Sequence, residues 1–288
     1  VVIINTSTLR TKKVFLRPKS SRSMKQTSIY SEESILNMFF RDYDLKGKSV
    51  ADITKEDIYD YANRDDKSSI AHRNKKITSI SSYLSYAIAN AYILKDPSYG
   101  VTVDKSKLSH EQKEKKKGTA FTKREYEAVK KRASYFWSIA ADFAWWTGLR
   151  LSDIARMEWA SFDPDHLIVH TLKTDTRVAL PYDDPLIGGG ILRDTIARIE
   201  PDDEVYCFPQ QAWLAKTASR RATLSTYFSR ELKRKVPSAS EEGKTFHSFR
   251  RAFVTRCKRE GKQLEDIALW VGHSSTETTK IYDVSARS

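Results

Sequence analysis

Apolar residues recur at helical spacing through the first hundred residues of the chain. Two stripes of apolar side chains, three or four positions apart, lie at Ile35, Leu36, Phe39 and Phe40 and at Ile77, Ile80, Leu84 and Ile88. Positions with this spacing share one face of a helix. Thr54 with Asp57 is a variant of the capping box that opens a helix, and Asp96-Pro97 is a sequence that ends one. The pattern predicts a small all-helical unit between residues 31 and 100.

The helical pattern resumes after residue 118 and changes its period once. A capping box at Thr122 and Glu125 precedes a strongly apolar run, which predicts a buried helix ending near Gly148. Two short β-like runs, 167–169 and 178–180, then predict a hairpin or small sheet. Helical spacing returns from about residue 191 to the end of the chain. The predicted fold class is therefore mainly α with a small β-sheet (α+β).

Composition narrows the choice of partner. The chain has 50 Lys and Arg against 37 Asp and Glu, which gives a net charge of +13. Such a basic balance favours a polyanion, either nucleic acid or an anionic membrane surface. Because no apolar run approaches the roughly 20 residues that cross a bilayer, we expect nucleic acid and no membrane. Cys207 and Cys257 have no metal-like spacing, and they indicate a reducing, cytoplasmic setting.

Basic segments divide the chain. Residues 1–31 hold seven basic side chains and no acidic one, which predicts a solvated N-terminal arm that can lie along phosphates. The segment 101–118 is rich in lysine and poor in apolar residues, as linkers are. We therefore expect an arm at 1–30, a helical domain at 31–100, a linker at 101–118 and a second domain at 119–288.

Four basic residues are candidates for contact with nucleic acid. Arg73, Lys75 and Lys76 lie near the start of the longest helix predicted in the first domain, and Arg251 lies in a basic helical segment of the second. Contacts between such side chains and phosphates release counterions. Binding is therefore expected to weaken as the salt concentration rises.

Six residues of the second domain combine the groups that phosphodiester chemistry requires: Arg150, Lys173, His247, Arg250, His273 and Tyr282. A catalyst must spread positive charge over the phosphate oxygens, supply a nucleophile and protonate the leaving group. Arginine suits the first task, because its planar fork pairs with phosphate and stays protonated. His247 and Arg250 lie three positions apart, so they share one helical face.

Each of the six residues has an ordinary structural explanation when it is taken alone. Arg150 would be a surface arginine, Lys173 a solvated lysine at a hairpin tip, and Tyr282 one of 14 tyrosines. Asp153 is placed either to hold a nearby cation or to begin the next helix. The order and spacing of the whole set carry the inference, and no single residue does.

Two other phosphate-handling classes lack their signatures in the sequence. No acidic cluster suggests a two-metal nuclease. No Walker-type glycine loop suggests the use of ATP, because Gly188-Gly189-Gly190 lacks the lysine of such a loop. We expect these three glycines to form a flexible turn.

With these motifs in place, the chain resembles the tyrosine recombinases, which include phage-type integrases and chromosome-dimer resolvases. The matching text lies at 147–153, 173–174, 247–251, 272–275 and Thr279 to Tyr282, and residues 31–101 resemble the helical core-binding domain of that family. The resemblance implies two domains that form a C-shaped clamp on double-stranded DNA. It also implies strand exchange by a homotetramer on two specific recombination sites.

The resemblance further assigns a role to each residue. Tyr282 would be the nucleophile that forms a 3′-phosphotyrosyl link and leaves a free 5′-hydroxyl. Arg150 and Arg250 would clamp the non-bridging oxygens, His247 and His273 would complete the phosphate pocket, Lys173 would be the general acid, and Asp153 would support the site. No metal, ATP or other cofactor would be required, because the bond energy is kept in the protein–DNA link.

Two alternative functions stay open at this point. A type IB topoisomerase would use the same chemistry to relax DNA, and a DNA-binding regulator would keep the fold without cleaving. All six catalytic positions are filled, which argues against the regulator. Only six residues follow Tyr282, whereas relatives commonly extend a terminal element onto a neighbouring protomer. The contact between protomers, and whether sequence precedes residue 1, are therefore not settled by these motifs.

Overall fold

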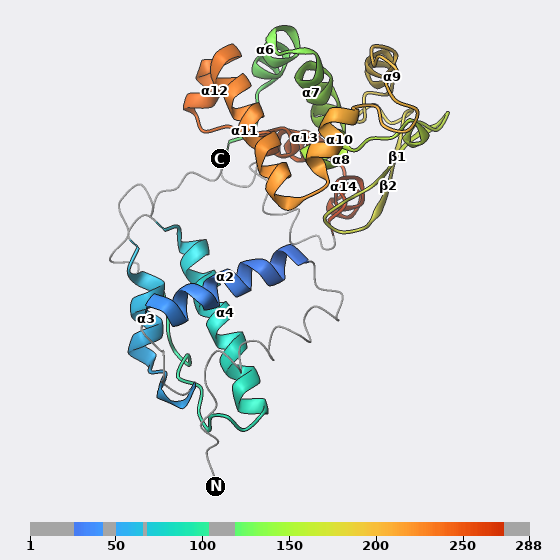
Figure 1. Cartoon of the computed structure of the whole chain (residues 1–288). Coiled ribbons are helices and arrows are strands. Elements are labelled where there is room, and N and C mark those ends of the chain that lie inside the picture. The colour runs from blue at the N-terminus through green and yellow to red at the C-terminus, as the bar shows by residue number, and fades with distance from the viewer. Residues whose placement is uncertain (1–25, 43–49, 66–67, 104–118, 274–288) are drawn as a thin grey trace. The chain divides into compact units, whose positions relative to one another are not determined.

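A computed structural model describes residues 26–42, 50–65, 68–103 and 119–273 of the 288-residue chain. The chain divides into two compact units, Val1–Lys115 and Lys116–Ser288, and each is described by itself. Figure 1 shows the helices of both units and the hairpin of the second. The fold class is confirmed, because the chain is mostly helical with one small antiparallel sheet.

In the described part of the first unit, three helices pack around an apolar core. These are α2 (Gln26–Asp42), α3 (Lys55–Asn63) and α4 (Ile70–Ala89), with a short 3₁₀ helix η1 (Val50–Asp52) between the first two. The α2 stripe and the α4 residues Ile80 and Leu84 are buried, so the apolar spacing predicted this core. Tyr61 of α3 donates a hydrogen bond of 2.9 Å to the carbonyl of Ile35, which ties α3 to α2.

Two boundaries of this unit differ from those predicted. Helix α2 begins at Gln26, so the last residues of the expected arm are helical. Helix α4 ends at Ala89, well before Asp96-Pro97, because Asn90 caps it and Ala91 takes a left-handed φ of 57°. The predicted start of α3 is confirmed, since Thr54 and Asp57 form the reciprocal capping box.

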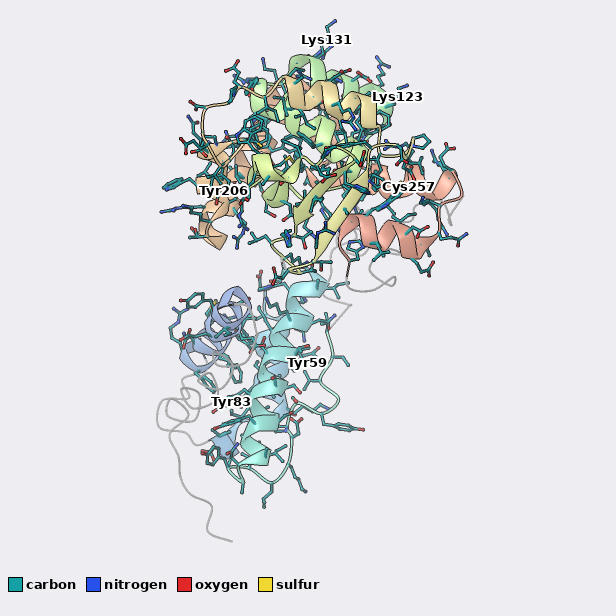
Figure 2. The ribbon with its side chains drawn as sticks, turned by 90° about the vertical axis from the view of Figure 1, so that its right-hand side faces the viewer. Tyr59, Tyr83, Lys123, Lys131, Tyr206 and Cys257 are labelled. Carbon is teal, nitrogen blue, oxygen red and sulfur yellow. The ribbon has the colours of Figure 1, made fainter. Side chains whose placement is uncertain are left out.

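The second unit carries most of the helices and the only sheet found among the described residues. Its elements are α6 (Lys123–Arg132), α7 (Tyr135–Thr147), α8 (Leu151–Ala155), η2 (Trp159–Ser161), β1 (His166–His170), β2 (Arg177–Pro181), α9 (Gly189–Ala197), α10 (Pro209–Ala215), α11 (Ala218–Lys235), α12 (Pro237–Glu241), α13 (His247–Arg259) and α14 (Leu264–Val271). The capping box predicted at Thr122 and Glu125 opens α6. Lys123 and Lys131 project outward from this helix (Figure 2).

Helix α7 forms the centre of the second core. Nearly all its residues are buried, and it packs against α6, α9 and α13. An apolar helix of this kind is predicted to be buried on all sides. Its last residue, Thr147, is therefore buried inside the unit. The rigid core fixes the position of the backbone that leads from α7 to Arg150.

The predicted hairpin is present. Strands β1 and β2 pair antiparallel, from His166 opposite Pro181 to His170 opposite Arg177. Leu167 and Val169 are buried while their neighbours are more exposed, as alternation along a half-buried strand requires. The hairpin therefore has one face on the core, and its connecting turn carries Lys173.

The glycine run at 188–190 is not the flexible turn that the sequence suggested. Gly188 takes a left-handed conformation and precedes α9, which begins at Gly189. A Cβ atom on Gly188 would lie 2.4 Å from the Trp146 ring, and one on Gly189 would lie 1.8 Å from the carbonyl oxygen of Tyr182. These two glycines are therefore needed for close packing.

Candidate active site

Arg150 emerges from the buried end of α7 through a tight turn. Gly148 ends α7 with a φ of 65°, and a Cβ atom there would lie 2.6 Å from the Phe253 ring. Arg150 is the N-cap residue of α8, and 15% of its side chain is exposed. Within the part of the chain that the structure describes, its Nη1 atom has no hydrogen-bond partner. A buried guanidinium nitrogen of this kind is suited to an anionic ligand.

Asp153 joins Arg150 to the hairpin. Its side chain is fully buried, with Oδ2 3.9 Å from Nη1 of Arg150. Its Oδ1 accepts a hydrogen bond of 2.9 Å from the backbone amide of Leu172. Burial raises the pKa of Asp153, whereas the Leu172 amide and the charges of Arg150 and Arg250 oppose this rise. Both roles that the sequence left open, cation partner and first turn of a helix, are therefore filled.

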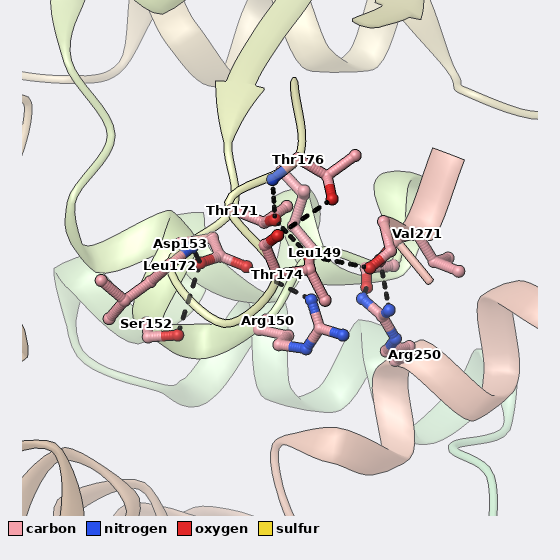
Figure 3. A network of polar contacts seen from close by, with 12 residues as sticks. Leu149, Arg150, Ser152, Asp153, Thr171, Leu172, Thr174, Thr176, Arg250 and Val271 are labelled. Carbon is pink, nitrogen blue, oxygen red and sulfur yellow. Dashed lines mark hydrogen bonds and ion pairs between the residues drawn. The ribbon is translucent and has the colours of Figure 1, made fainter. Parts of the chain in front are cut away.

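Lys173 lies in the turn between β1 and β2, with an exposed side chain. The residues on either side are held in place, Leu172 by Asp153 and Thr174 by the backbone of Gly272, whose carbonyl accepts a hydrogen bond of 3.2 Å (Figure 3). The position of the lysine backbone is thus fixed by two segments that are distant in sequence.

Arg250 ties together the ends of two helices. It is 1% exposed, and its Nη1 donates a hydrogen bond of 2.9 Å to the carbonyl of Gly148. Its Nη2 donates to the carbonyl of Val271, at the end of α14 (Figure 3). Gly148 precedes Arg150 by two positions, and Val271 precedes His273 by two. One buried side chain therefore sets the places of two other candidate residues.

The two histidines lie within the field of the same cations. His247 is the first residue of α13, and it is exposed. Partial desolvation by the surrounding protein, and then the charges of Arg250 and Arg251, lower its pKa to about 4. His273 follows Gly272, the left-handed cap of α14, and desolvation followed by Arg250 and Arg150 lowers its pKa to about 3. Both imidazoles are therefore neutral at pH 7.

A cavity of about 460 Å³ opens beside Arg150 and His247. Its lining includes Arg221, Ser225 and Ser229 of α11. The Ser229 hydroxyl donates to the carbonyl of Ser225, and Nη1 of Arg221 donates to the carbonyls of Ala215 and Lys216. Hydroxyl and guanidinium groups are the types that hold phosphate oxygens in proteins. The sequence pattern gave no reason to single out these three residues.

The residues proposed for nucleic-acid contact lie in different surroundings. Arg73 is fully buried and donates to the carbonyls of Ser68 and Asp65, at 3.2 and 2.8 Å. Lys76 is 6% exposed, and burial lowers its pKa. Contrary to our expectation, neither presents its charge at the surface. Lys75 is exposed, and Arg251 is half-buried on α13.

No group of three or more His, Cys, Asp or Glu side chains among the described residues is arranged to hold a metal ion. No described helix is both long and apolar enough to cross a membrane. Tyr282 lies outside the described residues, so its place relative to Arg150 and Arg250 stays a prediction.

Comparisons with known proteins give one family match and several structures with a similar fold. The model of the phage integrase family matches residues 112–288. No curated protein sequence matches the chain. A lambda integrase dimer bound to a COC′ core site has a similar structure, with a TM-score of 0.74, 19% identity and coverage of 98% of each chain.

Two further solved structures are similar to the chain. A lambda integrase tetramer bound to a Holliday junction has a TM-score of 0.74 and 17% identity, over 99% of this chain and 79% of the other. The Tn1549 transposon integrase, in complex with a circular intermediate DNA, has a TM-score of 0.70 and 14% identity, over 95% of each chain. At these identities the likeness shows the shared fold.

Proposed function

Because the chain belongs to the phage integrase family, we propose that it is a site-specific DNA recombinase, which cleaves and rejoins DNA through a 3′-phosphotyrosyl intermediate. One observation carries the proposal. Arg250 donates hydrogen bonds to the carbonyls of Gly148 and Val271, which brings the backbone next to Arg150 and His273 to the helix that also carries His247. Arg150, Lys173 and Arg250 also act on the pKa of both histidines, so these five side chains, from four segments of the chain, lie within one electrostatic neighbourhood. This is the arrangement that binding of a single phosphate requires.

The proposed reaction follows from the chemistry of these groups. The hydroxyl oxygen of Tyr282 attacks the phosphorus, and the bond from phosphorus to O5′ breaks. The ammonium group of Lys173 gives its proton to the leaving O5′, because an alkoxide is a poor leaving group. Arg150 and Arg250 spread positive charge over the non-bridging oxygens as negative charge develops there. Rejoining is the same sequence in reverse, with a 5′-hydroxyl as the nucleophile.

The neutral histidines fit this scheme. A neutral imidazole offers one N–H donor and one acceptor nitrogen, so His247 or His273 is able to accept the proton of Tyr282 or to donate to a phosphate oxygen. An anion bound beside them opposes the arginine charges that lower their pKa values. We therefore expect both pKa values to rise when the scissile phosphate binds.

The partner proposed is double-stranded DNA that contains a specific recombination site. Lys75 and Arg251 stay candidates for phosphate contact, because both reach solvent. We assign 26–100, which includes all of α2, to the core-binding domain and 119–288 to the catalytic domain, with the residues before α2 as a basic arm and 101–118 as the linker. By analogy with the lambda integrase dimer and tetramer on DNA, the protein would clamp DNA and act as a homotetramer on two sites, in the cytoplasm and without metal or ATP.

A nicked suicide substrate that carries the cognate site tests the function. Covalent protein–DNA adducts are expected in the presence of EDTA and without ATP, and they should be lost in Tyr282→Phe. Adducts that persist in that variant would refute the role of Tyr282. Supercoiled plasmid without the site provides a second arm, because efficient relaxation of it would favour a type IB topoisomerase. The absence of adducts on a verified site would favour a non-cleaving regulator.

A further inference from the structure

The turn that carries Lys173 is held by one hydrogen bond before the lysine and one after it, each to a different distant segment. Before the lysine, the amide of Leu172 is held by Asp153 at 2.9 Å. After it, the hydroxyl of Thr174 donates to the carbonyl oxygen of Gly272 at 3.2 Å. Figure 3 shows both anchors on the one turn. Thr174 and Gly272 both lie in segments that match the family, but no sequence pattern predicted a bond between them.

A chain of hydrogen bonds with a single direction crosses this turn. The hydroxyl oxygens of Thr171 and Thr174 lie 2.6 Å apart, and the amide of Thr176 donates to the Thr171 hydroxyl at 3.2 Å. A hydroxyl has one hydrogen to donate, and Thr174 gives its own to Gly272. Thr171 must therefore donate to Thr174. The chain runs from the Thr176 amide through both hydroxyls to the carbonyl that precedes His273.

The surroundings of this chain favour strong hydrogen bonds. Thr171 is 1% exposed. A Cβ atom on Gly272 would lie 2.9 Å from Cγ2 of Thr171 and 3.2 Å from Cγ2 of Val178, so the hairpin packs directly on the end of α14. Hydrogen bonds in a site that excludes water are stronger, and aligned hydroxyls polarise one another.

The turn needs such anchors because its backbone is not in a relaxed state. Asp175, two positions after the lysine, has a left-handed φ of 54°. This conformation is unfavourable for residues other than glycine, although aspartate tolerates it better than most, so contacts that hold the turn help to maintain it. The long, flexible lysine side chain adds no rigidity of its own.

We propose that Thr174 is a positioning residue for Lys173: its hydroxyl fixes the turn against Gly272, so that the lysine ammonium reaches the leaving O5′. This inference rests on the proposed function, in which Lys173 is the general acid. It adds a residue that acts through Lys173. Asp153 and Thr174 would then hold the same turn from opposite sides.

The test compares two variants of Thr174 on two leaving groups. Thr174→Val keeps the shape and removes the hydroxyl, whereas Thr174→Ser keeps the hydroxyl. Single-turnover cleavage by the full chain is measured with an ordinary substrate and with a 5′-bridging phosphorothiolate, whose thiolate leaves without a proton. On the ordinary substrate, we expect Thr174→Val to be about 10- to 100-fold slower, as for a displaced catalytic group, and Thr174→Ser to be within about 3-fold of wild type.

The phosphorothiolate separates positioning from a general structural effect. If Thr174 acts through Lys173, the deficit of Thr174→Val shrinks to less than about 3-fold with the sulfur leaving group. A deficit of equal size on both substrates overturns the proposal, and so does a wild-type rate for Thr174→Val on the ordinary substrate. The fraction of enzyme that cleaves is recorded with each rate, because partial unfolding lowers this fraction and leaves the rate constant of the folded enzyme unchanged.

Two controls keep the proposal distinct from the function on which it rests. Thr176→Val removes a hydroxyl from the same turn but retains the amide that begins the chain, and it is expected to have the smaller effect. Lys173→Ala must itself recover on the phosphorothiolate. If Lys173→Ala stays slow there, the general-acid role fails, and the role of Thr174 falls with it. If wild type cleaves neither substrate, the proposed function fails.

Discussion

The carbonyl oxygen of Gly148 accepts a hydrogen bond of 2.9 Å from Nη1 of Arg250, across 102 positions of sequence. Gly148 lies two residues before Arg150, so this bond sets the separation of the two arginines through the backbone. The other terminal nitrogen of Arg250 donates to Val271, two residues before His273. The buried guanidinium is therefore both a candidate phosphate ligand and the brace that places two others.

This double role makes Arg250→Lys informative. Lysine keeps the charge, but a single ammonium group lacks the planar fork that reaches both carbonyls. We expect cleavage at saturating DNA to fall by about 10²- to 10³-fold, as for the loss of one transition-state donor. Arg259→Lys, on the exposed end of the same helix, is the matched control. The brace is not required if Arg250→Lys cleaves as fast as this control.

Asp153→Asn separates the two contacts of that side chain. The amide oxygen still accepts from Leu172, but the negative charge opposite Arg150 is lost. Because burial raises the pKa of Asp153, its ionised form disfavours the folded state at neutral pH, so the neutral amide is expected to leave the melting temperature unchanged or to raise it. Cleavage should slow by about 10-fold, as for partners that orient a reacting group.

Asp153→Leu removes the acceptor as well, and it serves as the contrast. This variant leaves the Leu172 amide without its partner, so a lower melting temperature and slower cleavage are both expected. Thermal unfolding and single-turnover cleavage are measured on the same preparations. Equal melting temperatures for the two variants would show that the bond to Leu172 does not hold the turn.

Short-range sequence patterns predicted the helix starts and the hairpin, because these features depend on residues that are close together in the sequence. The capping boxes at Thr54 and Thr122 were visible because the paired residues lie three positions apart. The hairpin was visible because its register needs only the alternation in 167–169 and 178–180. His247 and Arg250 fall on one helix for the same reason, as their spacing indicated.

Contacts between distant segments left no such signal. The sequence indicated Arg73 as a phosphate ligand, but its side chain is buried and donates to the carbonyls of Ser68 and Asp65. Thr174 stands 98 positions from Gly272, and nothing in either neighbourhood predicts that bond. The sequence shows whether a residue is charged. Whether that residue is buried depends on which distant segment packs over it, and the sequence pattern does not show this.

The two histidines make the stability of the protein depend on pH in a defined window. The pKa values of His247 and His273 are about 4 and about 3 in the folded protein, below the ordinary value of 6.5. At these two sites the unfolded chain therefore binds more protons than the folded protein between about pH 3 and 6.5, so the contribution of the histidines to the free energy of unfolding rises with pH in that window and is constant above it. Because His247 is exposed, solvent screening makes its contribution to this pH dependence smaller.

Urea denaturation at pH 7 and pH 5 measures this contribution. Wild type should lose more stability on acidification than a His247→Asn, His273→Asn double variant. The carboxylates titrate in both proteins, so their effect on stability is the same and cancels when the two losses are compared. Equal losses in the two proteins would show that the histidines have ordinary pKa values in the folded state.

A buried ion pair holds the loop that leads into the helix of His247 and Arg250. Lys244, 2% exposed, lies 2.5 Å from one carboxylate oxygen of Glu125 and 3.0 Å from Glu242. Although burial acts to raise it, the hydrogen bonds from Lys244 and Thr122 lower the pKa of Glu125. The pair therefore adds stability above the ordinary carboxyl pKa, and this stability is lost as the pH falls.

Lys244→Met should cost about 2 kcal/mol of unfolding free energy at neutral pH, below the loss for a fully buried pair, because Glu125 keeps its bonds to Thr122. Glu125→Gln preserves the capping box and should lie between Lys244→Met and wild type. Glu241→Gln, exposed on α12, is the control and should change stability by less than about 0.5 kcal/mol. Urea denaturation at pH 7 measures all three, and if Lys244→Met is as stable as the control, the ion pair does not hold the loop.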